Sequence, residues 1–322
     1  MIDEAPRFRA DLDRIAHDID RPFLVAVSGG PDSMAMLTLA ADAFGGQVMA
    51  ATVDHRLRAE AASEAAMVSA HCASIGIPHA ILAPANPITG ASIQAQARTS
   101  RYALLADHAR ERGARAILTA HHVDDQAETF LMRAARGSGL AGLAGIRART
   151  EISGITILRP LLDWRRAELR AIVRRAEVPF VDDPSNHDER HDRTRFRRLL
   201  GENEWLDPPH LARSAATLAE TDADVRAIVE WLWTERAVRT DGEVRLATAG
   251  LPRELLRRLA RRAIGSVRTD AAVTQPDWSD SANIERLLDA LMTGKRSTQA
   301  GVLVSPRGGG WRFRVAPPRR DG

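Results

Sequence analysis

The sequence predicts an α/β protein with a doubly wound, mostly parallel sheet, followed by a helical connector and a small α+β C-terminal domain. Apolar runs at residues 23–27, 47–53, 78–83, 116–120 and 155–158 alternate with helix-forming segments. This alternation is typical of parallel strands that are covered by helices on both faces. A glycine turn, SGGPDS at residues 28–33, lies between the first strand and a helix start, where such sheets bind ligands.

The remaining elements follow from apolar periodicity and turn signals. We expect helices at 7–19, 59–75, 92–113, 164–176, 210–239 and 283–292, and two C-terminal strands at 302–305 and 311–315. The change of pattern along the chain places domain boundaries near residues 205 and 240. We therefore expect a nucleotide-binding domain at 1–205, a helical connector at 206–240 and a small basic domain at 241–322.

Composition describes an ordinary soluble protein, because 44% of the 322 residues are apolar and 27% are charged. No apolar run is long enough for a bilayer, and the start MIDEAPRFRADLDR is too acidic for a signal peptide, so we expect a cytoplasmic protein without a membrane partner. The single cysteine, Cys72, excludes an internal disulfide and a cysteine-built metal site. Oligomeric state stays open, with a homodimer as one option.

The turn at 28–33 has the composition of an anion site. Gly29 and Gly30 lack a Cβ, so an anion can approach the main chain, and the helix that follows directs its positive end there. Pro31 suits the first helical turn, where no N–H is needed. Asp32 repels phosphate and so indicates a bridging cation. The alternative is a simple turn in which Ser28 and Asp32 cap the helix.

Polar side chains also follow other strands. Asp54 and His55 come directly after the strand at 47–53. In the helix after 116–120, Asp125 and Glu128 share one face and could hold an ammonium group or a metal, although a capping box between them is an equal alternative. His121 and His122 suggest zinc, but they lack a third spaced ligand.

Two arginine-rich segments point to phosphate. The first surrounds Phe196 and includes Arg193 and Arg197, so it could pair with phosphates and stack on a base, or form a solvated helix face. The second is a stripe of Arg253, Arg257 and Arg261 along one helix face. For this stripe we expect a nucleic-acid backbone as the partner.

The SGGPDS turn resembles the pyrophosphate loop of ATP-pyrophosphatase (PP-loop) enzymes, whose fold is adenine nucleotide α-hydrolase-like. Three further blocks, TAHHVDDQAET at 119–129, RGSGLAGLAG at 136–145 and DDPSN at 182–186, follow in order. With them the chain is similar to the tRNA(Ile)-lysidine synthetase family. The resemblance implies that ATP adenylates O2 of the wobble cytidine in tRNA(Ile) with a CAU anticodon. Lysine then displaces AMP, and Mg²⁺ assists.

The resemblance also implies residue roles. ATP and its pyrophosphate would be bound by Ser28, Gly29, Gly30, Pro31, Asp32, Ser33, Asp54 and His55. Asp32 would hold the magnesium, and Arg101 would stabilise the nucleotide or the intermediate. Lysine would bind Asp125 and Glu128, so the catalytic set is Asp32, Arg101, Asp125 and Glu128. Transfer RNA would bind Arg193 and Arg197 in domain 1–205. The resemblance covers domain 241–322 only in its general layout, so there the arginine stripe itself predicts that Arg253, Arg257 and Arg261 bind the tRNA.

Some features depart from this family, and two alternatives remain. Thr194 replaces a usual asparagine, Gly201 stands where proline is common, and the chain carries one C-terminal module where longer members have two. A tRNA 2-thiocytidine synthetase shares the loop but needs several cysteines. A non-catalytic tRNA-binding protein would not need Asp32, Asp125 and Glu128.

Overall fold

The structure is a computed structural model that describes residues 2–90, 92–182 and 192–317. The chain divides into two compact units, residues 1–219 and 220–322, which we describe separately. The boundaries near residues 205 and 240 stay a prediction. Among the described residues, none of the helices combines the length and the apolar character that crossing a membrane requires.

The first unit contains a six-stranded sheet with the order β3-β2-β1-β4-β6-β5. Its strands are β1 (Phe23–Ala26), β2 (Val48–Val53), β3 (His79–Leu82), β4 (Ala116–Leu118), β5 (Arg149–Ile152) and β6 (Ile155–Leu158). All neighbours pair in parallel except β5, which pairs antiparallel with β6. The α/β class and the five expected strands are confirmed. The edge strand β5 was not expected.

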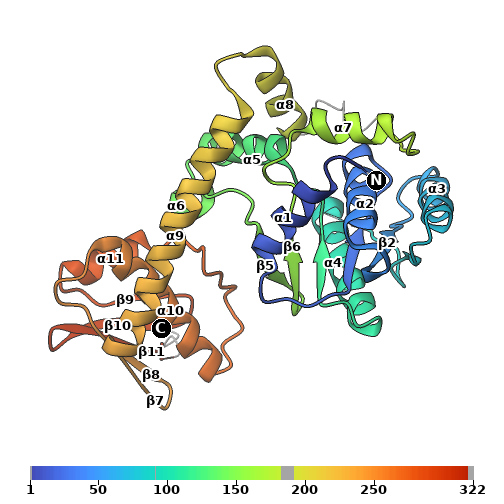
Figure 1. Ribbon diagram of the computed structural model, residues 1–322. Coiled ribbons are helices and arrows are strands. Elements are labelled where there is room, and N and C mark those ends of the chain that lie inside the picture. The colour runs from blue at the N-terminus through green and yellow to red at the C-terminus, as the bar shows by residue number, and fades with distance from the viewer. Residues whose placement is uncertain (1, 91, 183–191, 318–322) are drawn as a thin grey trace. The chain divides into compact units, whose positions relative to one another are not determined.

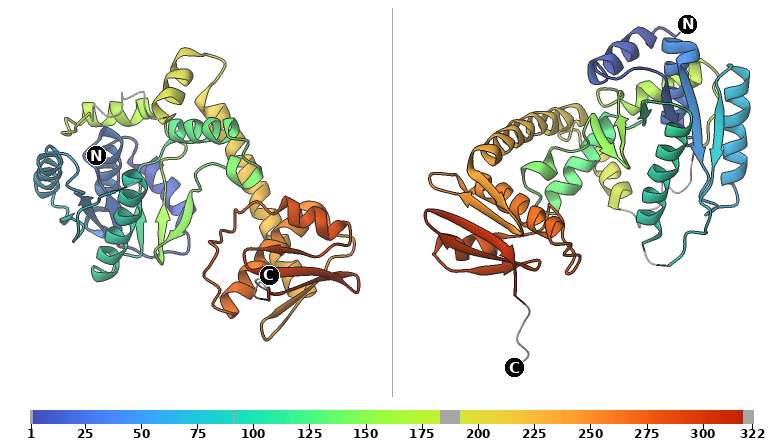
Figure 2. Two further views of the ribbon diagram at one scale, coloured as in Figure 1. Left: turned by 180° about the vertical axis from the view of Figure 1, so that it is seen from behind. Right: turned by 90° about the horizontal axis from the view of Figure 1, so that it is seen from below.

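Helices cover both faces of this sheet (Figures 1 and 2). The side chains of β1 alternate, so Phe23 and Val25 join a core with α1 (Ala5–Ile15), α2 (Pro31–Phe44) and α7 (Arg166–Arg175), while Leu24 joins a core with α4 (Ile93–Glu111). This two-sided burial explains the continuous apolar run of β1.

The other helices of the first unit are α3 (Ala61–Ser74), α5 (Val123–Ala135), α6 (Leu140–Leu143) and α8 (Asp192–Glu202), together with a 3₁₀ turn at Gly45–Gln47. The start of α9 (Pro208–Arg236) also belongs to this unit. The helices expected at 59–75, 92–113 and 164–176 are present with shorter ends, and the helix expected at 7–19 begins two residues earlier and ends four residues earlier. Most of the DDPSN block, residues 183–186, lies outside the described residues.

The second unit contains a five-stranded antiparallel sheet with the order β7-β8-β11-β10-β9. Its strands are β7 (Ala237–Thr240), β8 (Glu243–Ala247), β9 (Ser297–Gln299), β10 (Val302–Arg307) and β11 (Gly310–Val315). Helices α10 (Arg253–Asp270) and α11 (Glu285–Met292) and the end of α9 share its apolar core. The two expected strands are confirmed as β10 and β11. The helix expected through residue 239 was wrong at its end, because residues 237–239 pair with β8.

Candidate active site

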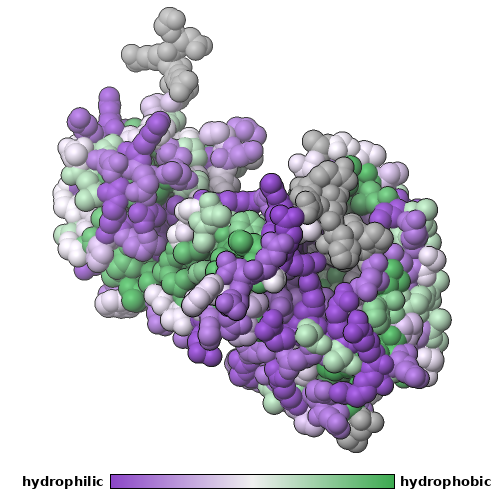
Figure 3. All heavy atoms as spheres, turned by 90° about the horizontal axis from the view of Figure 1, so that it is seen from above, coloured by the Kyte–Doolittle hydropathy of each residue, from purple (hydrophilic) through white to green (hydrophobic). Residues whose placement is uncertain are grey.

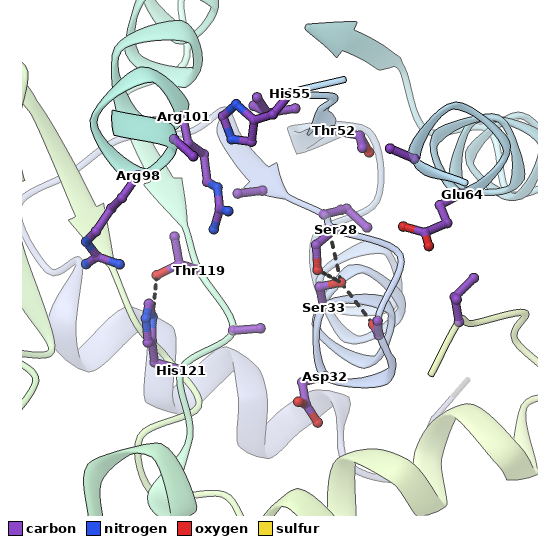
Figure 4. Close-up of a pocket in the computed structure, with 18 of the residues that line it drawn as sticks. Ser28, Asp32, Ser33, Thr52, His55, Glu64, Arg98, Arg101, Thr119 and His121 are labelled. Carbon is purple, nitrogen blue, oxygen red and sulfur yellow. Dashed lines mark hydrogen bonds between the residues drawn. The ribbon is translucent and has the colours of Figure 1, made fainter. Parts of the chain in front are cut away.

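A cleft of about 1250 Å³ opens beyond the carboxyl ends of β1 and β4. These two strands are neighbours in the sheet, but β2 continues from β1 on one side and β6 from β4 on the other. This reversal of strand order is where doubly wound sheets form a ligand crevice. The cleft is lined by the turn after β1, the segment after β4 and side chains of α4, α7 and α8. Figure 4 shows a close-up of part of this lining.

The turn after β1 has the geometry of an anion cradle. Gly29 has φ +86°, which a residue with a side chain rarely adopts, and a Cβ there would contact Met67 and Val68 at 3.5 Å. Helix α2 begins at Pro31 with Gly30 as its N-cap and no side-chain cap. Ser28 and Asp32 therefore do not cap the helix, and the alternative of a simple capped turn is wrong. First-turn amides without a side-chain partner are the groups that bind phosphate.

The two serines brace this cradle from within. The Ser28 amide donates to Ser33 Oγ at 3.1 Å, and Ser33 Oγ donates to the Gly30 carbonyl at 2.9 Å. The two hydroxyls lie 3.2 Å apart, and Figure 4 marks the hydrogen bond between them with a dashed line. These bonds hold the turn in its open shape before any ligand arrives.

Asp32 suits a magnesium ion shared with phosphate. Its Oδ1 is buried and has no hydrogen-bond partner among the described residues, and its Oδ2 lies 3.4 Å from His122 Nε2. No group of three or more His, Cys, Asp or Glu side chains in the described residues could hold a metal alone. A cation at Asp32 would therefore need the oxygens of a nucleotide as further ligands, which is the arrangement expected for magnesium.

Helix α5 begins with a capping box that differs from the expected one. His122 is the N-cap: its Nδ1 accepts from the Asp125 amide at 3.3 Å, and Asp125 Oδ2 accepts from the His122 amide at 3.2 Å. The alternative box between Asp125 and Glu128 is wrong, because Asp125 is the third helical residue. Burial would lower the pKa of His122, but Asp125 and Asp32 raise it overall.

His121 lies at the cleft and is uncharged at neutral pH. Its Nδ1 is 3.1 Å from the Thr119 hydroxyl (Figure 4). Burial lowers the pKa of His121 to about 4. The neutral imidazole is therefore available for hydrogen bonding to a ligand.

Asp125 and Glu128 are held by arginines of α8. Arg193 donates to Asp125 Oδ1 and to Glu128 Oε2, each at 2.8 Å, and Arg197 Nε donates to Glu128 Oε1 at 2.8 Å. The Glu128 side chain is only 1% exposed, whereas Asp125, Arg193 and Arg197 line the cleft. His122 and Arg193 hold the pKa of Asp125 at about 2 although burial opposes this. This pairing of Asp125 and Glu128 with Arg193 and Arg197 was not predicted from the sequence.

The opposite wall of the cleft comes from β2 and α4. Asp54 Oδ1 accepts from the Arg56 amide at 2.8 Å and so shapes the turn after β2. Both ring nitrogens of His55 are buried without a hydrogen-bond partner among the described residues. Burial and the nearby Arg101 lower the pKa of His55. Figure 4 shows Arg101 extending from α4 toward the centre of the lining residues.

The expected cleft residues thus gather in one place, with two qualifications. Gly29 and Glu128 support the cleft from behind rather than line it. Two cationic lining residues of α7, Arg166 and Arg170, had no predicted role. Arg195 of α8, which also lines the cleft, belongs to the arginine-rich segment around Phe196 that could pair with phosphates. Figure 3 shows hydrophilic side chains over much of the molecule as seen from above, interrupted by patches of hydrophobic ones.

The three arginines expected to bind tRNA from the second unit are already paired within it. Arg253 contacts Glu285 at 2.7 Å and Asp289 at 2.6 Å, Arg257 contacts Glu285 at 2.6 Å, and Arg261 donates to the Ala282 carbonyl at 3.0 Å. The bonds from Arg257 and Arg253 lower the pKa of Glu285 to about 2. That these arginines bind tRNA stays a prediction.

The fold and the cradle define a PP-loop ATP-binding enzyme, and the family model of the PP-loop domain matches residues 5–204. The chain is 44% identical to a tRNA(Ile)-lysidine synthase of Novosphingobium aromaticivorans over 98% of this chain and 95% of that protein. It is 43% identical to one of Zymomonas mobilis over 92% of this chain and 89% of that protein. The chain therefore belongs to the tRNA(Ile)-lysidine synthase family, whose members are ligases.

A solved structure supports the fold independently. The U34-tRNA thiolase NcsA of Methanococcus maripaludis matches with a TM-score of 0.55 over 68% of this chain and 77% of that chain. The two sequences are 16% identical, so the likeness concerns the fold alone.

Proposed function

We propose that this protein ligates L-lysine to the wobble cytidine of tRNA(Ile) with a CAU anticodon, at the expense of ATP. The observation that carries the proposal is the uncapped glycine turn after β1 facing the same cleft as Asp125 and Arg193. One crevice thus combines a phosphate cradle with a carboxylate suited to an amine. Family membership supports the choice of lysine and tRNA as the substrates.

In the first step, O2 of the cytidine attacks the α-phosphorus of ATP and pyrophosphate leaves. The amides of the turn at 28–33 would bind the pyrophosphate. Magnesium held at Asp32 would neutralise charge on the phosphates. Arg101, whose pKa burial lowers, would remain cationic and face the nucleotide from α4. These groups act by position and charge, which is what phosphoryl-type transfer mainly needs.

In the second step, the ε-amine of lysine attacks C2 of the adenylated cytidine, and AMP leaves with the former O2 while the amine releases a proton. Asp125, which lines the cleft, offers the carboxylate for the lysine. Glu128 is buried and would act through Arg193 and Arg197, which it orients. His121 would serve as a hydrogen-bond partner, because a group with a pKa of about 4 is a weak base at neutral pH.

A thiolation enzyme is the nearest alternative, and Cys72 argues against it. It is the single cysteine of the sequence, it lies on α3 fully buried in the core, and burial raises the pKa of its thiol to about 11. A thiol that is neither exposed nor ionised is a poor sulfur carrier.

Mass analysis of anticodon nucleosides tests the proposal directly. The protein is incubated with ATP, magnesium, lysine and a tRNA(Ile) transcript, and the nucleosides are digested and separated. We expect a cytidine that has gained lysine and lost water, together with stoichiometric AMP. Isotopically labelled lysine should shift the mass of this nucleoside. An unmodified wobble cytidine, or AMP release that does not depend on lysine, would overturn the proposal.

A further inference from the structure

The sheet of the second unit has one covered face. Alternate side chains of β8, β10 and β11 point into the core with α10 and α11, and all of them are buried: Val244, Leu246, Val302, Val304, Trp311 and Phe313. Figures 1 and 2 show these helices beside the strands. Because side chains alternate along a strand, the residues between them point to the other face.

The other face is rich in arginine. The register places Arg245 of β8 opposite Arg312 of β11, and Glu243 opposite Arg314, so these side chains share one face. Arg307 of β10 lies on the same face, because it is five residues after the inward Val302. Arg307 pairs with Gly310, which in turn pairs with Ala247 of β8. The positions beside Arg307 on this face therefore carry no large side chain. Strands lie about 4.8 Å apart, which brings guanidinium groups on adjacent strands close together.

One carboxylate opposes these four arginines among the described strand positions of this face. Glu243 contacts Arg245 at 2.6 Å and also pairs with Arg312. Its side chain is only 11% exposed, and the bond from Arg312 lowers its pKa. Glu243 therefore stays ionised, and its negative charge is shared between Arg245 and Arg312. Arg245 is 61% exposed despite this contact, and Arg307 and Arg314 are also exposed. The face therefore keeps a net positive charge.

The helix side of the same unit is different. On α10, Arg253 and Arg257 share Glu285, Arg258 pairs with Asp222 and Glu254, and Arg262 pairs with Glu230. A phosphate approaching this side would have to displace carboxylates. On the sheet side, a phosphate would meet four arginines, and Glu243 is the one carboxylate among the described strand positions of that face.

We propose that the exposed sheet face carrying Arg245, Arg307, Arg312 and Arg314 binds the sugar-phosphate backbone of the tRNA substrate. This inference rests on the proposed function, since it takes tRNA as the RNA. A phosphate backbone fits because its charge is opposite and repeated, and because contacts to it need no sequence-specific groups.

The test is the salt dependence of tRNA binding by the full chain. A fluorescent tRNA(Ile) transcript is titrated with wild type and with the triple variant Arg245→Gln, Arg307→Gln, Arg314→Gln between about 50 and 300 mM salt, a range in which phosphate contacts dominate affinity. Arg312 is kept so that Glu243 retains a partner. We expect the slope of log K against log salt to fall by about 2 to 3 and the Kd to rise roughly 10- to 100-fold near 0.1 M salt.

Arg239→Gln is the matched control. Arg239 lies on β7 of the same sheet, but it contacts Asp270 of α10 at 2.9 Å on the helix side. The variant Arg239→Gln removes one positive charge from the unit, and its slope of log K against log salt should stay within error of wild type. Arg314→Gln alone, which also removes one charge, should lower the slope by about 1. Thermal unfolding of each variant shows whether the unit remains folded.

The outcomes separate this inference from the proposed function. If wild type binds the transcript and the triple variant binds with the same slope, the sheet face is not the RNA surface. If wild type does not bind the transcript at all, the proposed function falls together with the inference. If light scattering shows that wild type is a dimer and the triple variant a monomer with unchanged RNA affinity, the face joins two copies of the chain and the inference is wrong.

Discussion

Arg193 Nε donates to Glu128 Oε2 at 2.8 Å, and its Nη2 donates to Asp125 Oδ1 at the same distance. One guanidinium group thus bridges the two carboxylates that the sequence assigns to lysine. A charged pair of this kind, with one partner buried, depends on both members. An incoming ammonium group at Asp125 would therefore compete with Arg193, so lysine binding and the position of α8 should be linked.

Glu128→Gln should slow the second step more than the first. The amide cannot satisfy both Arg193 and Arg197, so their positions beside Asp125 loosen. We expect a loss of about 100-fold in the lysine-dependent step, the size seen when one oriented electrostatic partner is removed. In single-turnover experiments with ATP labelled at the α-phosphate, label should accumulate on the tRNA.

Asp192→Asn is the control for this variant. Asp192 lies at the start of α8, the helix that carries Arg193 and Arg197, but it pairs with Arg136. With Asp192→Asn, the α-phosphate label should pass from ATP to the tRNA and then to AMP, as with wild type. Lysidine formation at the wild-type rate by Glu128→Gln would remove Glu128 from the lysine step.

Gly29→Ala should damage the phosphate cradle. The φ of +86° is strained for alanine, and the new methyl group would contact Met67 and Val68. We expect a loss of about 1 to 3 kcal/mol in the free energy of unfolding and weaker ATP binding. Gly46→Ala is the control, because a Cβ there would meet no atom within 4 Å and its φ is not positive. Equal effects of the two variants would contradict a special role for Gly29.

Asp32→Ala should abolish AMP formation and leave tRNA affinity nearly unchanged. Asp32 lies in the cradle and offers a buried oxygen without a partner, which suits magnesium rather than RNA. AMP release and transcript binding are measured on the same preparation. Wild-type AMP production by this variant would take Asp32 out of the reaction.

His121 should make the folded protein sensitive to acid. Its pKa is about 4 when folded and about 6.5 when unfolded, so the unfolded chain binds more protons between these values. The contribution of His121 is thus fully present above pH 6.5 and is lost as the pH falls toward 4. Between pH 6.5 and 4, His121→Gln should lose less unfolding free energy than wild type. Parallel losses in both proteins would show that His121 titrates normally.

The sequence predicted the parallel sheet well because five apolar runs each became a strand. Four of these strands are largely buried, and β3 at the edge of the sheet is partly exposed. The sequence also contained signals that went unused. Ser153 and Gly154 form the two-residue turn between β5 and β6, both with positive φ, and Asp241-Gly242 joins β7 to β8. Dipeptides of this kind favour hairpins, so strands β5, β7 and β8 could have been predicted from the sequence.

The site was only partly predictable, for a physical reason. Motif spacing along one element predicts which side chains share a face, so Asp125 and Glu128 were grouped correctly. It does not predict which cation from a distant helix fills the space between them. Arg193 is 68 residues after Asp125, and only tertiary structure brings the two together.

The stripe of Arg253, Arg257 and Arg261 gives the last prediction. From sequence alone, changing all three to alanine should flatten the salt dependence of tRNA binding by about 3, one unit for each phosphate contact. The ion pairs with Glu285, Asp289 and Glu254 favour a smaller change, because guanidinium groups that already neutralise carboxylates release fewer counterions. The triple variant should instead lower the melting temperature, since these carboxylates lose their partners. A slope change below 1 with a lower melting temperature assigns the stripe to folding of the unit. A change near 3 means that the arginines leave their carboxylates for phosphate.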